Sequence, residues 1–285
     1  MPSLIDIRRR IRTVKNTQQI TKAMKMVAAA KLRRAQDRVL AARPYSAGLR
    51  RLLANIASAA RLNEAHSDLH PLLAIRPEKR IQLLVLTSDR GLAGAFSMNV
   101  IKEAQQFLAD HSQATVEIEA VGRKGRDYFR RRATLSGEHV GIIDRARQAD
   151  ASRISDPLVA RYAAREIDAI YAIGNEFKSV LSQRVVVEKL LPLTVDESTP
   201  VTDYLIEGDP LRMLDTLLPL YVENILLRMM LESAAAEHAA RMTAMDAATS
   251  NAKEVIDKLT LTMNRMRQAS ITKEIIEVVS GAEAL

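Results

Sequence analysis

The chain of 285 residues contains no cysteine and no tryptophan. The missing cysteines exclude disulfides, thiolate metal sites and cysteine nucleophiles, and they fit a reducing compartment. Aromatic residues make up only 4% of the chain, whereas 47% is hydrophobic and 27% is charged. This composition is typical of a folded protein whose helices pack along aliphatic stripes. No apolar run approaches the about 18 residues of a membrane-spanning helix, so we expect none.

Glycine and proline are missing from two long stretches near the chain ends. Ser3 to Arg43 spans 41 residues without either, and Leu220 to Ser280 spans 61. Each stretch predicts one uninterrupted helix, about 60 Å and about 90 Å long at a rise of about 1.5 Å per residue. A compact domain of this size cannot enclose such rods, so they must pair with each other or project into a partner.

Apolar and small residues recur along both stretches in alternating steps of three and four, which predicts a coiled coil. Small and polar side chains make the contact stripe weaker than one of leucine or isoleucine; these are Gln18, Thr21, Thr249 and Ala252. The second helix exceeds the first by about 20 residues, or roughly 30 Å, so its tip needs another partner. The stripe residues are Leu4, Ile7, Ile11, Val14, Met24, Ala28, Leu32, Ala35 and Val39, then Met242, Met245, Thr249, Ala252, Ile256, Leu259, Met263 and Met266.

Acidic residues are scarce in the first helix. The first sixty residues hold fourteen Lys or Arg against two acids, a net charge of +12, while the remainder of the chain carries −4. Three interpretations stay open: a solvated face, a contact with nucleic acid or anionic lipid, and a protein partner with acidic loops. No aromatic residue precedes Tyr45, and single-stranded nucleic acid normally needs aromatic stacking platforms. This disfavours the RNA interpretation.

The middle of the chain alternates short strand and helix patterns, which predicts a parallel or mixed sheet with right-handed crossovers. A third helix is expected from Ser155, as its cap, to about Glu166, with Pro157 in the first turn. Predicted strands are Arg80 to Thr87, Thr115 to Val121, Ala169 to Phe177 and Val185 to Leu191; predicted helices are Ala95 to Ala109 and Lys124 to Arg132; Ser88 to Gly94 is a turn.

The predicted fold class is therefore α/β plus a long α-helical coiled coil, in which an antiparallel pair of terminal helices flanks a Rossmann-like α/β central domain. We divide the chain into an N-terminal shaft helix (1–60), a linker (61–78), an α/β foot domain (79–207) and a C-terminal shaft helix (208–285).

Candidate sites for chemistry are weak. His66 and His70 have helical ligand spacing, but no third ligand surrounds them and Pro71 follows, so we expect no metal site. Gly91 and Gly94 lie between a strand and a helix, where a phosphate loop would be, yet the stretch matches neither G-x-G-x-x-G nor a P-loop. We expect a tight turn and no cofactor.

Four segments resemble the gamma subunit of F-type ATP synthases, in the same order and over nearly the whole length. The most specific is ITKEIIEVVSGA (271–282), and QQITKAMKMVA (18–28), SDRGL (88–92) and RMTAM (241–245) accompany it. The resemblance implies a non-catalytic rotor subunit whose paired terminal helices turn inside a hexamer of alternating alpha and beta subunits.

Further partners that the resemblance implies are an epsilon subunit and a membrane c-ring, at the cytoplasmic face of a bacterial inner membrane and without a transmembrane segment. No nucleic acid is expected. Residues that fall at the family's contacts with the catalytic hexamer are Met24, Lys25, Arg267, Gln268, Ser270 and Thr272. Tyr204 and Glu207 fall where the family's foot meets the membrane ring.

Two alternatives come from other classes. A basic helical scaffold that binds nucleic acid would show an affinity that falls steeply with salt. A nucleotide-using enzyme built on the central domain would bind ATP or NAD as an isolated chain.

Overall fold

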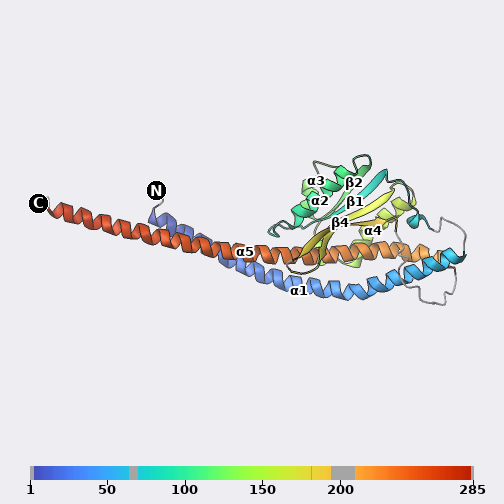
Figure 1. Cartoon of the computed structure of the whole chain (residues 1–285), viewed down its shortest axis with the longest axis horizontal. Coiled ribbons are helices and arrows are strands. Elements are labelled where there is room, and N and C mark those ends of the chain that lie inside the picture. Colours follow the sequence, from blue (N-terminus) through green and yellow to red (C-terminus); the bar gives the residue numbers. More distant parts are fainter. Residues whose placement is uncertain (1–2, 64–69, 181, 194–208, 284–285) are drawn as a thin grey trace. The chain divides into compact units, whose positions relative to one another are not determined.

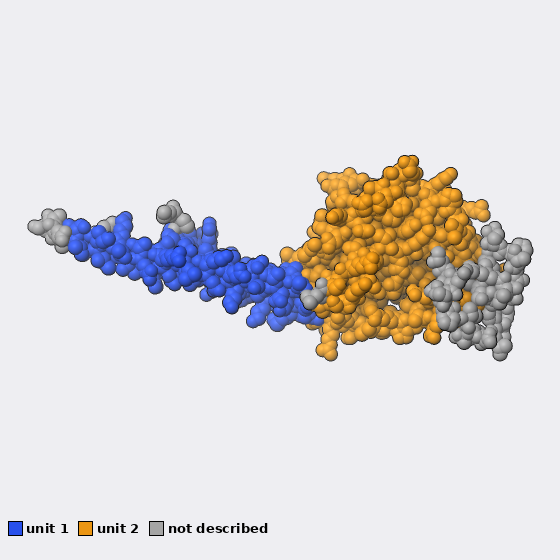
Figure 2. Space-filling view, viewed as in Figure 1, with its two compact units in different colours: residues 1–29, 241–285 blue, residues 30–240 orange. Residues whose placement is uncertain are grey.

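The computed structural model describes residues 3–63, 70–180, 182–193 and 209–283. It divides into two compact units, which Figure 2 shows in different colours. Residues 1–29 and 241–285 form the helix-pair unit, and residues 30–240 form the sheet unit. Two long helices, α1 (Leu4–Asn63) and α5 (Pro210–Glu283), contribute residues to both units (Figure 1).

Helix α1 begins with a capping box. The backbone N–H of Asp6 donates to Ser3 Oγ at 3.2 Å, and the N–H of Ser3 donates to the Asp6 carboxylate at 3.1 Å. This reciprocal pair satisfies amides that have no partner within the helix. The carboxylate also accepts from the Ser3 hydroxyl at 2.9 Å, and this bond, together with the one from the Ser3 N–H, holds the pKa of Asp6 below its usual value.

Both long helices exceed their stretches without glycine and proline. Helix α1 continues through Pro44, and α5 contains Pro219. A proline inside a helix removes one backbone hydrogen bond, but packing on either side can hold the helix together. Leu49 and Leu53 are buried beyond Pro44, and Leu214 and Leu218 are buried before Pro219. Tertiary packing therefore overrides the local signal at both prolines.

The sheet unit is built on a five-stranded mixed sheet of order β3-β2-β1-β4-β5. Strands β1 to β4 are parallel, and β5 pairs antiparallel with β4. This confirms the predicted α/β fold with a mixed sheet. The sequence patterns missed β3, a short edge strand whose central Gly137 breaks any apolar alternation. The strands are β1 (Arg80–Leu86), β2 (Thr115–Val121), β3 (Leu135–His139), β4 (Ala169–Phe177) and β5 (Gln183–Leu191).

Helices cover both faces of this sheet. On one face α2 (Phe96–Asp110) and α3 (Arg123–Phe129) share a core with the strands, in which Leu83 packs with Val100 and Phe129. On the other face α5 approaches β4 at Gly174, where a Cβ atom would lie 3.7 Å from Met229. The central strand β1 is consequently buried at every residue after Arg80.

Helix α4 (Gln148–Ala163) begins earlier than the sequence predicts. Asp150 accepts a hydrogen bond from the backbone N–H of Arg147 at 3.1 Å, which starts the helix two turns before Ser155. The expected cap at Ser155 is therefore wrong: this residue is buried within the helix, and Pro157 also lies inside it. The error arose because a Ser-x-Pro pattern typical of a helix start occurs here within a longer helix.

Within the sheet unit, a short 3-10 helix, η2 (Ile143–Arg145), contacts both long helices. Asp144 accepts from Lys31 Nζ of α1 at 2.7 Å and lies 2.8 Å from His238 Nε2 of α5. Burial raises the pKa of Asp144, but the hydrogen bond and charge of Lys31, together with His238, bring it below the usual value. One carboxylate thus holds two helices, and it is most effective when ionised.

Candidate functional site

In the helix-pair unit the two helices pack along the stripes that the sequence predicts. Ile7, Ile11 and Ala28 of α1 are buried, as are Met245 and Ala252 of α5. Residue numbers rise along one helix as they fall along the other, since Lys25 contacts Asp246 while Thr21 contacts Thr249. The predicted antiparallel coiled coil is confirmed.

The middle of this stripe is polar. The hydroxyl oxygens of Thr21 and Thr249 lie 2.8 Å apart, and Gln18 Nε2 donates to the Thr249 carbonyl at 3.5 Å. Each threonine hydroxyl also lies within hydrogen-bond distance of a carbonyl of its own helix. Such a contact fixes which residues face each other, but it buries little apolar surface.

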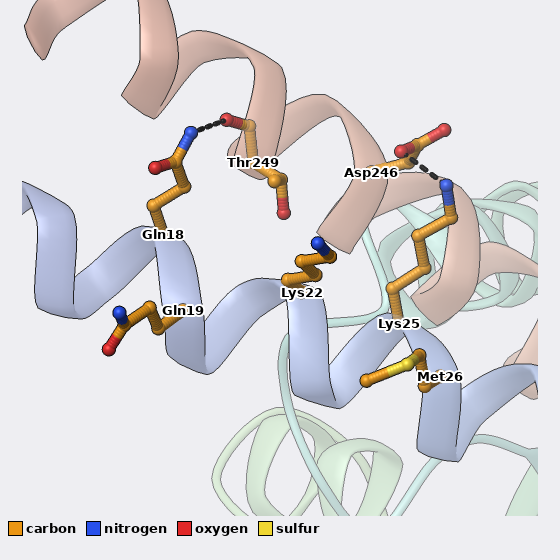
Figure 3. A pocket seen from close by; sticks show the side chains of 7 residues that line it. All are labelled: Gln18, Gln19, Lys22, Lys25, Met26, Asp246 and Thr249. Carbon is orange, nitrogen blue, oxygen red and sulfur yellow. Dashed lines mark hydrogen bonds and ion pairs between the residues drawn. The ribbon is translucent and has the colours of Figure 1, made fainter.

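A groove lies on the surface beside this polar contact (Figure 3). Lys25 Nζ reaches across the helix pair to the Asp246 carboxylate at 2.6 Å. Both side chains keep large exposed fractions, 41% and 61%, so the ion pair is worth only about 0–1 kcal/mol. A partner's charge could therefore replace it at little cost. Residues that line the groove are Gln18, Gln19, Lys22, Lys25, Met26, Asp246 and Thr249.

The two predicted contact residues of α1 are consecutive in the chain, but they lie in different surroundings. Met24 is half-buried at the stripe, and Lys25 is half-exposed at the groove. The sequence patterns did not single out Asp246, although the antiparallel pairing places it opposite Lys25. Two apolar side chains of α1 remain exposed nearby, Met26 at 62% and Val27 at 59%.

The four predicted contact residues of α5 lie near its end. Arg267, Gln268 and Thr272 are exposed, and Ser270 is partly exposed. Their local bonds stay within α5: Thr272 Oγ1 donates to the Gln268 carbonyl at 3.0 Å, and Ser270 Oγ lies 3.2 Å from Glu274 Oε1. None of these bonds brings them to Met24 or Lys25.

From Ile271 onward α5 also carries exposed apolar side chains, with Lys273 and Glu274 among them. In the helix-pair unit its C-terminal end extends past the first residues of α1 (Figure 1). A run of exposed apolar side chains on one helix end is unusual for a protein that functions alone and marks an interaction surface. These side chains are Ile271, Ile275, Ile276, Val278 and Val279, all about half exposed or more.

The two predicted ring-contact residues, Tyr204 and Glu207, lie outside the described residues. Of the histidine pair, His66 also lies outside them, whereas His70 binds within the chain. Its Nδ1 accepts from the N–H of Leu72 at 3.1 Å, and its Nε2 lies 3.1 Å from Asp215. Among the described residues no group of three or more possible metal ligands occurs.

In the turn after β1, the position where a phosphate would bind is filled by an aspartate side chain of the chain. Asp89 accepts from the backbone N–H of Arg123, at the start of α3, and from that of Gly141, both at 3.0 Å. A phosphate at this edge of the sheet would need such amides. Gly122, which precedes α3, packs against the end of β1: it has a φ of 104°, and a Cβ atom there would lie 2.0 Å from the Thr87 carbonyl oxygen, so only glycine fits. The turn is thus a packed structural element.

Comparison with known proteins gives consistent results. The family model described as ATP synthase matches residues 3–285. An ATP synthase gamma chain from Solibacter usitatus is 59% identical over 100% of this chain and 99% of its own length. Another, from Pelotomaculum thermopropionicum, is 47% identical and is covered completely.

Solved structures give the same fold. The central stalk/c-ring structure of the Tetrahymena thermophila mitochondrial ATP synthase matches with a TM-score of 0.61 at 25% identity, over 80% of this chain and 99% of that one. The Euglena gracilis mitochondrial ATP synthase structure in rotational state 3 matches with a TM-score of 0.66 at 18% identity, over 99% of this chain and 94% of that one. Over the part of the chain that the structure describes, no helix has the length and apolar character needed to cross a membrane.

Proposed function

The chain belongs to the family of ATP synthase gamma chains, and we propose that it is the central rotor stalk of an F-type ATP synthase. In this role it transmits torque between an ion-driven membrane c-ring and a catalytic hexamer of alpha and beta subunits, with an epsilon subunit bound beside it. The observation that carries the proposal is the antiparallel helix pair, whose two helices also run through the sheet unit.

We assign residues 1–60 and 208–285 to the shaft, 61–78 to a linker and 79–207 to the foot. On the shaft, the proposed contacts with the catalytic hexamer are Met24 and Lys25 beside the groove and Arg267, Gln268, Ser270 and Thr272 near the end of α5. The exposure of most of these side chains supports this assignment. The foot residues proposed to meet the ring are Tyr204 and Glu207.

A rotor needs torsional stiffness together with little resistance to sliding. Continuous backbone hydrogen bonds along α1 and α5 supply the stiffness. Weak, exposed charges such as the Lys25–Asp246 pair supply an electrostatic surface that exchanges partners without a large barrier. The apolar end of α5, from Ile271 to Val279, suits a water-free sleeve provided by the hexamer.

The chain itself catalyses no bond chemistry in this proposal. The turn at Asp89, where a nucleotide phosphate would bind in an α/β domain, is filled by the carboxylate of the chain. We place the protein at the cytoplasmic face of the bacterial inner membrane, as a peripheral subunit. The alternative of a nucleic-acid scaffold finds no support in the comparisons.

The test is reconstitution of the complex with a charge reversal at the groove. The complex should copurify in fixed stoichiometry with the alpha and beta subunits. Lys25→Glu should weaken ATP-driven ion pumping more than assembly, and the defect should depend on salt, because one rim charge tunes an interface rather than forming it. Lys102→Glu, an exposed reversal on α2, is the matched control and should pump normally. Pumping by Lys25→Glu equal to wild type at every ionic strength would contradict the assignment of Lys25.

A further inference from the structure

A second groove, within the sheet unit, is not used by any step of the proposed rotation. It lies between α1 and α5 beside the first residue of α4 and has a volume of about 210 Å³. Four of its residues repeat along α5 at the spacing of one helix face, and two come from α1. The lining residues are Ala42, Tyr45, Gln148, Leu220, Glu223, Asn224 and Leu227.

Glu223 is the unusual residue of this groove. It is nine-tenths buried, and its Oε1 has no hydrogen-bond partner among the described residues. Its neighbour Asn224 is already engaged, because Asn224 Oδ1 accepts from Ser46 Oγ at 2.7 Å. A carboxylate oxygen that is shielded from water and has no hydrogen-bond partner destabilises the fold until a donor or a cation reaches it.

Two other buried carboxylates of the same unit have cationic partners. Asp168 lies 3.0 Å from an Arg80 nitrogen, and Glu232 lies 3.4 Å from an Arg228 nitrogen. Glu223 differs from these two carboxylates, because its Oε1 has no partner among the described residues. A positive charge brought into the groove would complete the pattern.

The other residues that line the groove indicate which chemical group would fit it. Leu220, Leu227 and Ala42 offer apolar surface, which suits an alkyl stem. Tyr45 keeps 53% of its surface exposed, so its ring is available to a cation. A volume of about 210 Å³ is below the roughly 300–1,000 Å³ of typical small-molecule pockets. It suits a single long side chain.

We propose that this groove receives a lysine or arginine side chain from a neighbouring subunit of the complex, with the cation over Glu223 and the stem between Leu220 and Leu227. The inference rests on the proposed function, because it requires an assembled complex. It assigns Glu223 and Tyr45 to an interface that is separate from the contact residues of the shaft.

The experiment uses the assembled complex with p-benzoylphenylalanine in place of Tyr45. Irradiation should join this position to another subunit, at a peptide that contains a Lys or Arg within a few residues. Adding Glu223→Gln, which keeps the shape and removes the charge, should lower the cross-link yield at least fivefold. Glu103→Gln, an exposed change on α2, should leave the yield unchanged.

Two results would overturn the proposal. One is cross-linking only within the chain itself, and the other is a yield that Glu223→Gln does not alter. The same probe at Leu52, which is exposed on α1, reports whether Glu223→Gln disturbs the fold, because its yield should not change. A complex that assembles and pumps but fails this test refutes the groove proposal alone. Failure of the complex to assemble with the wild-type chain would instead refute the proposed function.

A second measurement separates a protein side chain from a free cation. The full-length chain is titrated with n-butylguanidinium and with its neutral isostere N-butylurea, while methyl signals of Leu227 are followed by NMR. Only the guanidinium should bind saturably, and Glu223→Gln should weaken it at least tenfold. Equal binding of both compounds would overturn the cation site. Binding of guanidinium without any intersubunit cross-link from position 45 would overturn the subunit as its source.

Discussion

The same helix, α5, has two different environments in the two units. In the sheet unit, every residue from Met229 to Ala239 is buried. In the helix-pair unit, burial along α5 is confined to one stripe, with Met245 and Ala252 as its buried residues. A helix that is buried on all sides is held by packing, whereas a helix with one narrow stripe leaves most of its surface for partners. The first environment anchors the helix, and the second exposes a surface that a hexamer can grip.

The largest effect that would break this comparison is a helix interruption in the helix-pair unit. Met245→Pro removes a backbone hydrogen bond and clashes with the preceding turn, at a cost of about 3 kcal/mol or more. We expect the complex to hydrolyse ATP while ion pumping is lost. Met245→Leu, which conserves volume, should retain pumping. Normal pumping by an assembled Met245→Pro complex would count against a continuous shaft.

A second pair of changes compares the two environments directly. Met230→Ala in the sheet unit empties a fully buried site and should cost about 2–5 kcal/mol. Met263→Ala in the helix-pair unit removes a half-buried side chain and should cost about 1 kcal/mol or less. Denaturant unfolding, followed by probes in each unit, would measure both. Equal losses would show that the two environments do not differ in packing.

The polar centre of the helix pair gives a smaller and more diagnostic effect. Thr249→Val removes one hydroxyl of the Thr21–Thr249 contact and should destabilise the helix pair by about 1 kcal/mol. Replacing both threonines by valine should be nearly neutral or stabilising, because neither hydroxyl is then left facing an apolar side chain. A double-mutant cycle on thermal unfolding measures the coupling. Additive losses would mean that the two hydroxyls do not interact.

The smallest effect concerns the pH dependence of the sheet unit. Burial, opposed by Asp215, lowers the pKa of His70 below its usual value of 6.5. As the pH falls below about 6.5, the folded chain binds fewer protons than the unfolded chain. The contribution of neutral His70 to the free energy of unfolding is therefore fully present above about pH 6.5. It is lost as the pH falls through the folded pKa.

Unfolding midpoints between about pH 7.5 and pH 5 would test this effect. His70→Gln should flatten the fall in stability, because it removes the titrating group. Asp215→Asn should steepen it, because it removes the charge that raises the pKa of His70. Identical pH profiles for the three proteins would refute a role for His70.

Sequence reasoning predicted those parts of the fold that repeat a period. The helix stripes from Ile7 to Ala28 and the strand at Thr115 follow from apolar spacing, whereas the strand at Ala169 is distinguished from a helix by Gly174 and its aromatic residues. It failed where local and tertiary signals conflict. The Ser155–Pro157 pattern was mistaken for a helix start, and β3 at the sheet edge has too few apolar residues to be recognised.

The candidate sites could be predicted only in part. Lys25 was found through the family resemblance, but its partner Asp246 follows only from the register of two helices far apart in sequence. Glu223 could not be recognised, since a polar residue between Val222 and Ile225 is indistinguishable from an exposed position until the packing of α1 is known. Both grooves depend on the pairing of two helices that are far apart in the sequence, which no local sequence pattern reveals.

The most direct measurement of the central claim uses the absence of cysteine from the chain. A single Lys22→Cys change at the groove of the helix pair accepts a benzophenone reagent attached through a reducible disulfide. After irradiation of the assembled complex, a cross-link to a catalytic subunit should stop ATP turnover, and a reducing agent should restore it. Undiminished coupled turnover in the fully cross-linked complex would contradict a shaft that turns within the hexamer.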